Sequence, residues 1–353
     1  MRSLTRSVVA LCLLVGACSP AAEPTTTTSS TIPTTSTTST VATTTTTALP
    51  SDLSPLTGLP VSDPELIQRQ VLAVKIDNHP QAVPQSGVEQ ADVVIEMLVE
   101  GITRFLTLWL ESDSGYLGPM RSGRPTDATL LAPLNHPTFA RSGAQDWVQT
   151  FISNRDVHQV GEIGGDATFR VSHRSSPHNL YVSTIALREW ADARGYPSDP
   201  PDPIWEFGPL PSSARPASHV RLDFNRNIVE WTWDEDEGLW LRTAYNRDSM
   251  WIDRDGKTGR LGAPVLVAFQ VEMYQATPDD GQVGTPVPAS KTTGTGRAWV
   301  LADGRVVEGT WKRPDEKAGW FVLEDPSGNT IPIPPGRPWI SLVPATGGLT
   351  YEP

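Results

Sequence analysis

The chain has 353 residues and a formal net charge of −12 at pH 7, from 28 basic and 40 acidic side chains. This acidic balance argues against a nucleic-acid-binding protein and against a broad face that binds anionic membrane, since both partners repel negative charge. The length is sufficient for two ordinary domains. Beyond the N-terminus, no apolar run is long enough for a membrane-spanning helix.

The N-terminus predicts a lipoprotein signal peptide over residues 1–17. Two arginines lie in the first six residues, and the apolar run 8–15 is too short to span a bilayer. Small residues directly precede Cys18, as in a bacterial lipobox, where the signal is cleaved and the cysteine is acylated, for example with palmitate. The alternative is a plain signal peptide with an incidental cysteine. We expect Cys18 to anchor the protein to the extracytoplasmic face of the cell membrane, and we expect no disulfide, since Cys12 leaves with the signal.

Residues 18–50 predict a disordered tether between the anchor and the folded part. Between residues 25 and 47, all but four positions are Thr or Ser. Such a segment cannot bury enough apolar surface to become ordered. We expect it to hold the folded part away from the membrane.

Residues 51–205 predict an N-terminal α/β (α+β) domain with a mixed sheet. Short apolar runs bounded by turn residues are typical of buried strands, and apolar positions at helical spacing after Pro or Thr are typical of helices. The expected strands are 71–76, 93–99 and 105–110, and the expected helices are 126–134, 146–151 and 184–193.

The first polar cluster of this domain follows its first predicted strand. Asp77 and Asn78 come directly after the run 71–76. In open α/β sheets the carboxyl ends of strands border ligand crevices. The alternative is a simple turn, because Asp and Asn before Pro often start one.

Charges interrupt the most apolar part of the chain, residues 91–125. Glu96 and Glu100 share one side of an extended chain, Arg104 opens the next strand, and Arg121 and Arg124 follow on a glycine-containing loop. Buried charges are costly unless they are paired. The stretch therefore predicts either a structural ion-pair network or the wall of a polar binding site.

A second polar concentration lies at residues 170–181 and contains Arg174, His178 and Asn179. The alternative to a functional loop is a solvated loop. We find no G-x-S-x-G motif and no zinc-binding spacing of histidines, so no catalytic residue can be assigned and no metal or cofactor is expected.

Residues 206–353 predict a small β-rich C-terminal domain. Seven prolines crowd residues 197–216, which favours a stiff connector at the domain boundary. Turn signals then separate short strands at regular intervals. Eight of the twelve tryptophans lie from Trp231 onward and indicate core packing, with glycan stacking as the alternative. The expected strands are 220–224, 228–233, 239–242, 265–271, 298–301, 305–311, 320–323 and 339–343.

Nine segments of the chain, in order, resemble the YerB-like family of bacterial lipoproteins, whose two domains have no known function. They are PLTGLPV, VLAVKIDNHPQAVPQSG, ADVVIEMLVEGITRF, GPMRSGRP, SPHNLY, WDEDEGLWLR, VLVAFQ, GTGRAWVLADGRVVEGTW and PGRPWISLVP. The chain departs from the family at residues 140–144, which read Ala-Arg-Ser-Gly-Ala where the family often has His-Ala-Gly-Gly-Ser. The resemblance implies an α/β domain followed by a β-rich domain, membrane anchoring, and an association with cell-envelope or peptidoglycan synthesis.

Three hypotheses for the function remain open from the sequence. The first is an envelope lipoprotein that binds an anionic cell-wall ligand or a wall-synthesis protein through the polar residues named above, because Arg recognises carboxylates and phosphates with paired donors. The second is a hydrolase or transferase of wall polymer that uses Glu96 or Glu100 with His178. The third is a structural spacer without a ligand. One-to-one pairing of acids with arginines would favour the spacer.

Overall fold

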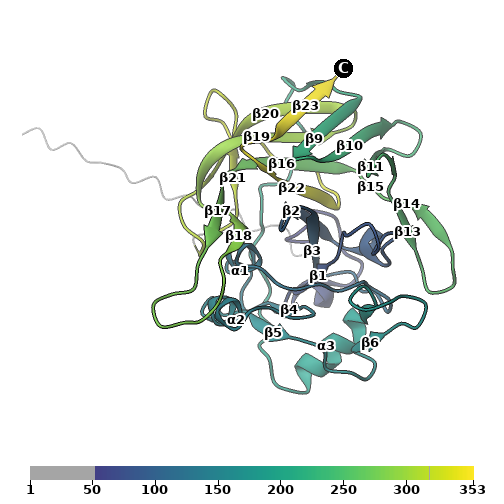
Figure 1. The fold of residues 1–353 in the computed structure, drawn as a ribbon. Helices are drawn as coiled ribbons and strands as arrows, with labels where there is room; N and C mark the ends of the chain where they lie inside the picture. Colours follow the sequence, from purple (N-terminus) through teal and green to yellow (C-terminus); the bar gives the residue numbers. More distant parts are fainter. Residues whose placement is uncertain (1–51, 318) are drawn as a thin grey trace, which may run out of the picture. The chain divides into compact units, whose positions relative to one another are not determined.

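The computed structural model describes residues 52–317 and 319–353 (Figure 1). The predicted signal peptide, Cys18 and the predicted tether lie outside this part of the chain. Every helix and strand expected from the sequence overlaps an observed element of the same kind, as the bounds below show.

The largest sheet contains strands from both halves of the chain. It is mixed: β1 pairs antiparallel with β3 and parallel with β4, and β22 is parallel to both of its neighbours, β16 and β2. In spatial order its strands are β21 (Val322–Glu324), β20 (Arg305–Arg313), β19 (Gly294–Ala302), β16 (Val265–Val271), β22 (Pro338–Pro344), β2 (Val93–Leu98), β3 (Thr103–Trp109), β1 (Leu72–Ile76), β4 (Thr138–Ala140) and β5 (His158–Val160), with β8 (Arg215–Pro216) beside β20.

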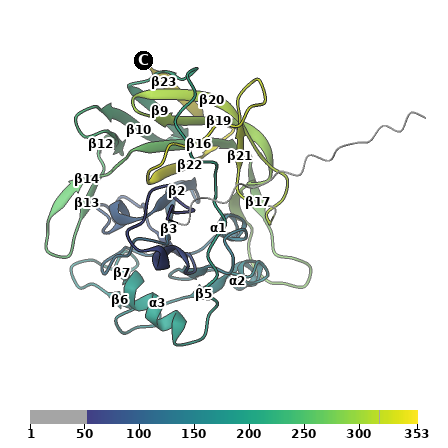
Figure 2. The same ribbon diagram turned by 180° about the vertical axis from the view of Figure 1, so that it is seen from behind.

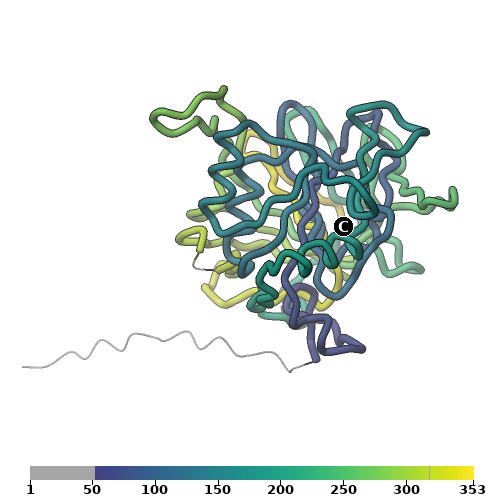
Figure 3. The backbone as a smooth tube through the Cα atoms, turned by 90° about the horizontal axis from the view of Figure 1, so that it is seen from below, coloured from purple at the N-terminus to yellow at the C-terminus, as the bar shows by residue number. Residues whose placement is uncertain are grey.

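Strand β22 of the C-terminal half therefore lies next to β2 of the N-terminal half. Their register places Ile95 opposite Ile340 and Glu96 opposite Ser341. Figure 3 shows the yellow C-terminal segment running beside the purple N-terminal one. The two predicted domains thus share one sheet, and the described residues belong to one compact unit.

A second sheet of six strands packs on one face of the large sheet. Its apolar side chains, such as Trp231 and Trp240, belong to one core cluster with Val74 and Val94 of the large sheet. The strands are β12 (Arg247–Asp248), β11 (Leu239–Ala244), β10 (Asn227–Asp234), β9 (His219–Phe224) and β23 (Gly348–Glu352), with β15 (Gly262–Ala263) beside β11.

Helices cover part of the opposite face of the large sheet. Ala128 and Trp147 from the first two helices share a core cluster with Ala73 and Ile95, and Figure 2 shows the second helix near β5 from behind. Neighbouring residues of β1 and β2 thus belong to opposite cores, which explains their continuous apolar runs. These two helices are α1 (Pro125–Leu131) and α2 (Asp146–Ser153), whereas α3 (Thr184–Asp192) contributes Leu187 to the other core cluster; short 3₁₀ turns lie at Pro64–Ile67 and Val88–Gln90.

The fold is β-rich throughout, with few helices, so the expected α/β class describes it only in part. In the described part of the chain, the three α-helices have seven to nine residues each. Three two-stranded ribbons complete the fold: β6 (Thr168–Arg170) with β7 (Leu180–Val182), β13 (Met250–Ile252) with β14 (Thr258–Arg260), and β17 (Met273–Ala276) with β18 (Val287–Ser290).

The proline-rich segment 197–216 packs against both halves of the chain. Ile204 and Trp205 are buried, the backbone N–H of Ile204 donates to the carbonyl of Pro55, and the indole of Trp205 donates to the carbonyl of Phe321. A domain boundary at residues 205/206 stays a prediction. Six of the eight C-terminal tryptophans are buried, which agrees with their interpretation as core residues.

Candidate functional site

Asp77 lies at the centre of the polar residues that the structure brings together. It follows β1, and its carboxylate is fully buried. Its Oδ2 atom is 2.7 Å from Nδ1 of His178 and 3.3 Å from Nε of Arg121, and its Oδ1 atom accepts the backbone N–H of His79. An ionised carboxylate can only accept a hydrogen bond, so the proton on this side of the ring lies on Nδ1, and Nε2 of His178 is directed away from Asp77.

His178 is held in one orientation by a second contact. Its ring stacks on the ring of His79, with centroids 4.9 Å apart and planes inclined by 18°. The residue lies on the loop between β6 and β7, far from Asp77 in sequence. A carboxylate that orients an imidazole is an arrangement suited to proton transfer or to binding an anion.

Arg121 is the cation of this cluster with the most free hydrogen-bonding capacity. Its backbone N–H donates to the carbonyl of Lys75, which fixes the loop beside β1. The side chain is 24% exposed and approaches Asp77, yet it makes no hydrogen bond to any residue in the described part of the chain. Its guanidinium can therefore donate to a ligand.

Glu100, Arg104 and Arg124 form a triad next to this position. The Glu100 carboxylate lies 2.6 Å from Nε of Arg124 and 3.4 Å from Nη2 of Arg104. Burial alone would raise the pKa of Glu100, but the two guanidiniums bring it below its ordinary value. Burial, followed by the charge of Arg124, lowers the pKa of Arg104 to about 10.

A surface pocket of about 390 Å³ opens beside this triad. Glu100 and Arg124 contribute to its wall, together with Ser122 and Gln145 from neighbouring loops and Val287 from β18. A polar pocket of this size, next to cations, can accept a small anionic group.

Glu96 has a different role from the other predicted acids. Its carboxylate is fully buried and accepts hydrogen bonds from Arg242 at 2.6 and 3.3 Å, from the indole of Trp339 at 3.1 Å, and from the hydroxyl of Thr103 at 2.7 Å. With both oxygens engaged, Glu96 is a structural residue that ties the two halves of the chain together.

Asn78 belongs to the same structural network as Glu96. Its side-chain amide donates to Thr103, whose hydroxyl donates to Glu96. The carbonyl oxygen of the Asn78 side chain accepts a hydrogen bond from Gln85 at 2.8 Å, and its backbone carbonyl accepts one from the hydroxyl of Tyr245. Asn78 thus positions the chain directly after Asp77.

Lys75 and Asp127 form a second fully buried pair that the sequence analysis missed. Nζ of Lys75 is 2.7 Å from Oδ1 of Asp127, and burial lowers the pKa of Lys75 to about 8 despite this partner. The other oxygen of Asp127 caps α1 by accepting the backbone N–H of Arg124. The signal in the sequence was a single Lys inside an otherwise apolar strand.

Two predicted residues are held by other partners at the edge of the cluster. The guanidinium of Arg174 donates to the backbone carbonyls of Gln81 and Pro84, on the loop after Asp77. The side chain of Asn179 accepts a hydrogen bond from Arg170 at 2.7 Å. In the described part of the chain, neither Arg174 nor Asn179 forms a hydrogen bond or ion pair with Asp77 or Glu100.

The connected cluster has a small excess of positive charge. Its basic side chains are Lys75, Arg104, Arg121 and Arg124, and its acidic ones are Asp77, Glu100 and Asp127. Four cations against three carboxylates leave a net charge of +1 before His178 is counted.

Among the described residues there is no group of three or more His, Cys, Asp or Glu side chains suited to a metal ion, and no helix able to cross a membrane.

Comparison with known proteins finds relatives along almost the whole folded part. Residues 56–197 match the N-terminal domain, and residues 220–340 the C-terminal domain, of the family described as "Protein of unknown function (DUF3048)". The chain is 28% identical over 304 residues to "Putative lipoprotein YerB" of Bacillus subtilis (strain 168), covering 82% of this chain and 86% of that protein. It is also similar to the crystal structure of the YerB protein from Bacillus subtilis, with a TM-score of 0.70, 26% identity, and coverage of 84% of this chain and 99% of that one.

Proposed function

We propose that this chain, which belongs to the YerB-like family of proteins with paired DUF3048 domains, is a lipid-anchored envelope protein. In this proposal it binds an anionic ligand. The ligand is a cell-wall polymer or an anionic segment of a wall-synthesis protein, bound at the cluster around Asp77, Arg121 and Glu100. The anchor is Cys18, and the protein faces the extracytoplasmic side of the membrane.

The observation that supports this proposal is the state of Arg121. The charges of the cluster are paired, as a structural network requires, and Arg121 approaches Asp77 through Nε at 3.3 Å. Its side chain is nevertheless 24% exposed and makes no hydrogen bond within the described residues, so its outer donors are unused. The neighbouring cations Arg104 and Arg124 raise the local potential, and Glu100 neutralises only part of it. An arginine with free donors in such a field favours phosphate or carboxylate groups.

A binding assay with isolated cell-wall fragments tests the proposal. The purified lipidated protein in detergent is titrated with fragments before and after chemical removal of their phosphate polymers. Arg121→Ala should weaken binding by about tenfold or more, because a charge-assisted contact contributes about 1.5–3 kcal/mol. The matched control is Arg221→Ala, which removes an exposed arginine on β9.

Each outcome of this assay has a defined meaning. Loss of binding after phosphate removal identifies a phosphate ligand, and retained binding that still depends on Arg121 identifies a carboxylate ligand. Equal binding of wild type and Arg121→Ala to every fragment and to purified wall-synthesis proteins would overturn the proposal.

A second candidate function, hydrolysis or transfer of wall polymer, is favoured by the Asp77–His178 pair. The carboxylate of Asp77 contacts the imidazole of His178 directly. Glu96 is instead paired with Arg242, and Glu100 is paired with two arginines. Release of soluble sugar or peptide from wall fragments by wild type, abolished in His178→Gln, would support this function over simple binding.

A further inference from the structure

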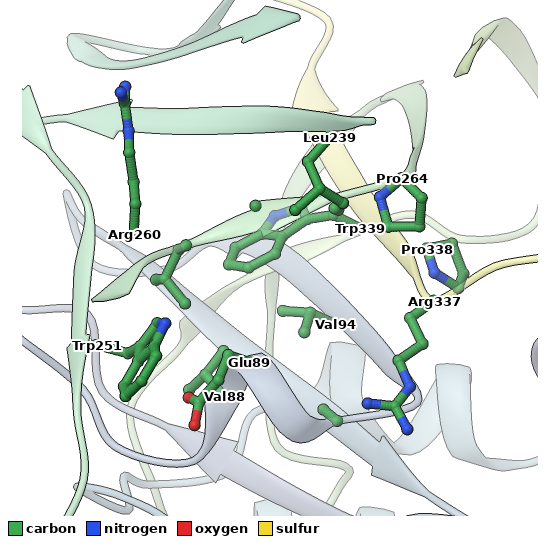
Figure 4. A pocket seen from close by; sticks show the side chains of 14 residues that line it. Val88, Glu89, Val94, Leu239, Trp251, Arg260, Pro264, Arg337, Pro338 and Trp339 are labelled. Carbon is green, nitrogen blue, oxygen red and sulfur yellow. The ribbon is translucent and has the colours of Figure 1, made fainter. Parts of the chain in front are cut away.

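A second cavity lies away from the Asp77 cluster, at the seam between the two halves of the chain (Figure 4). Its volume is about 300 Å³, at the lower end of the range for small-molecule sites. Val88 and Val94 come from the N-terminal half, and Trp251, Pro264 and Trp339 from the C-terminal half. The floor is therefore largely apolar.

Glu89 supplies the acidic group of this cavity. Its Oε1 atom accepts a hydrogen bond from the side chain of Gln90 at 2.9 Å, but its Oε2 atom is buried and has no hydrogen-bond partner in the described part of the chain. Burial raises the pKa of Glu89, and the negative charge of Asp253 adds to the rise. A carboxylate with one oxygen left without a donor has unused acceptor capacity, and a ligand donor that reaches this side chain would use it.

Arg337 supplies the basic group and lies apart from Glu89 and Trp251 across the view of Figure 4. Its side chain is 44% exposed, and its guanidinium approaches one carboxylate oxygen of Asp92 at 4.0 Å. It makes no hydrogen bond to a side chain or backbone group within the described residues. The other arginine of the wall, Arg260, directs its guanidinium to Asp248 and Thr243 instead.

The wall that carries Trp251 is held rigidly. Trp251 stands opposite Gly259 in the β13–β14 ribbon, and a Cβ atom at Gly259 would lie 2.4 Å from the indole ring. Only a glycine allows the ring to lie this close to the neighbouring strand. The aromatic wall is thus preformed, which lowers the entropic cost of binding a ligand there.

From this arrangement we infer that the seam cavity binds a short zwitterionic peptide with an apolar side chain. Its ammonium group donates to Glu89, its carboxylate accepts from Arg337, and its apolar part covers Val94 and Trp339. Charge complementarity at two separated points supports this ligand class over a purely apolar one. The inference concerns a different site and does not rest on the proposed function above.

A ligand series on the unmodified protein provides the first test. The lipidated protein in detergent is titrated by calorimetry with L-alanyl-L-leucine, its N-acetyl form and its C-terminal amide. We expect measurable binding of the free dipeptide and a loss of about tenfold or more for each capped form, because each cap removes one charged contact. This test needs no substitution, so it decides the question even if a variant fails to fold.

Two variants then assign the contacts. In Glu89→Gln the free and the N-acetylated dipeptide should bind with equal affinity. In Arg337→Gln the free dipeptide and its C-terminal amide should bind with equal affinity, as in a double-mutant cycle. Glu65→Gln and Arg221→Gln, at exposed positions elsewhere, should leave both penalties unchanged. The inference is overturned if the dipeptide does not bind, if capped and free forms bind equally, or if the penalties persist in the two variants.

Discussion

Glu96 on β2 and Arg242 on β11 form a fully buried two-point ion pair between residues 146 positions apart in the sequence. The guanidinium also lies 5.3 Å from the ring centroid of Phe105 and 5.4 Å from that of Trp339, and it donates to the hydroxyl of Ser249. One acid from the N-terminal half is thereby satisfied by one base from the C-terminal half, so this contact determines how the two halves fit together.

Glu96→Ala should reduce the free energy of unfolding by about 3–5 kcal/mol, because Arg242 would stay buried without its partner. The measurement is urea denaturation followed by far-UV circular dichroism. As a control, Glu65→Ala removes an exposed carboxylate that forms no ion pair within the described residues and should cost no more than about 0.5 kcal/mol. Replacing both partners, as Glu96→Leu with Arg242→Met, should restore part of the loss. Equal effects at Glu96 and Glu65 would contradict the assignment.

Lys75 should make stability depend on pH in the alkaline range. Its pKa is about 8 in the folded state and 10.5 in the unfolded state, so the unfolded state binds more protons between these values. The contribution of Lys75 to the free energy of unfolding therefore rises with pH from about 8 to 10.5, by up to about 3 kcal/mol. Denaturation at pH 7.5, 9 and 10 measures it.

Lys75→Met is the comparison for that measurement, since it keeps the apolar stem and removes the titrating group. As the pH rises, the free energy of unfolding of wild type should increase relative to that of Lys75→Met. An exposed control, Lys257→Met, should show no such trend. A constant difference across the three pH values would show that Lys75 stays charged in the folded state.

Cys18→Ser should move the protein from the membrane fraction to the soluble fraction after cell breakage. The described residues contain no helix that could replace the lipid anchor, and a lipid chain supplies the membrane affinity. Metabolic labelling with a fatty acid provides the second readout and should be lost in the same variant. Retention of a processed Cys18→Ser protein in the membrane would contradict the anchor assignment.

Proteolytic cleavage within residues 197–216 should leave the two fragments bound to each other. Strand β22 lies between β2 and β16, and the Glu96–Arg242 pair adds a buried contact, so a cut in the connecting segment removes neither. Limited proteolysis followed by native mass spectrometry measures the outcome. Separation of the fragments without denaturant would show that the shared sheet contributes little.

The sequence alone determined the local features of this protein. The charged N-terminus, the short apolar run and Cys18 predict a lipid anchor from a pattern contained within eighteen residues. The apolar runs around Val74, Ile95 and Leu106 identified three strands, because side-chain alternation is a property of the strand itself. The charged residues among them were recognisable as candidates for pairing or binding, since dehydrating a charge is costly in any fold.

The tertiary structure alone decided which charges are paired and which are available. Glu96 and Glu100 looked equivalent in the sequence. In the structure, Glu96 is paired with the buried Arg242, whereas Glu100 lies with Arg124 at the wall of a pocket. Lys75 is paired with Asp127 because α1 begins beside β1. Strand β22 pairs with β2, although more than two hundred residues separate them in the sequence. Partners of this kind are set by strand order and long-range packing, because a buried charge is satisfied by whichever group the completed fold places within a few ångströms.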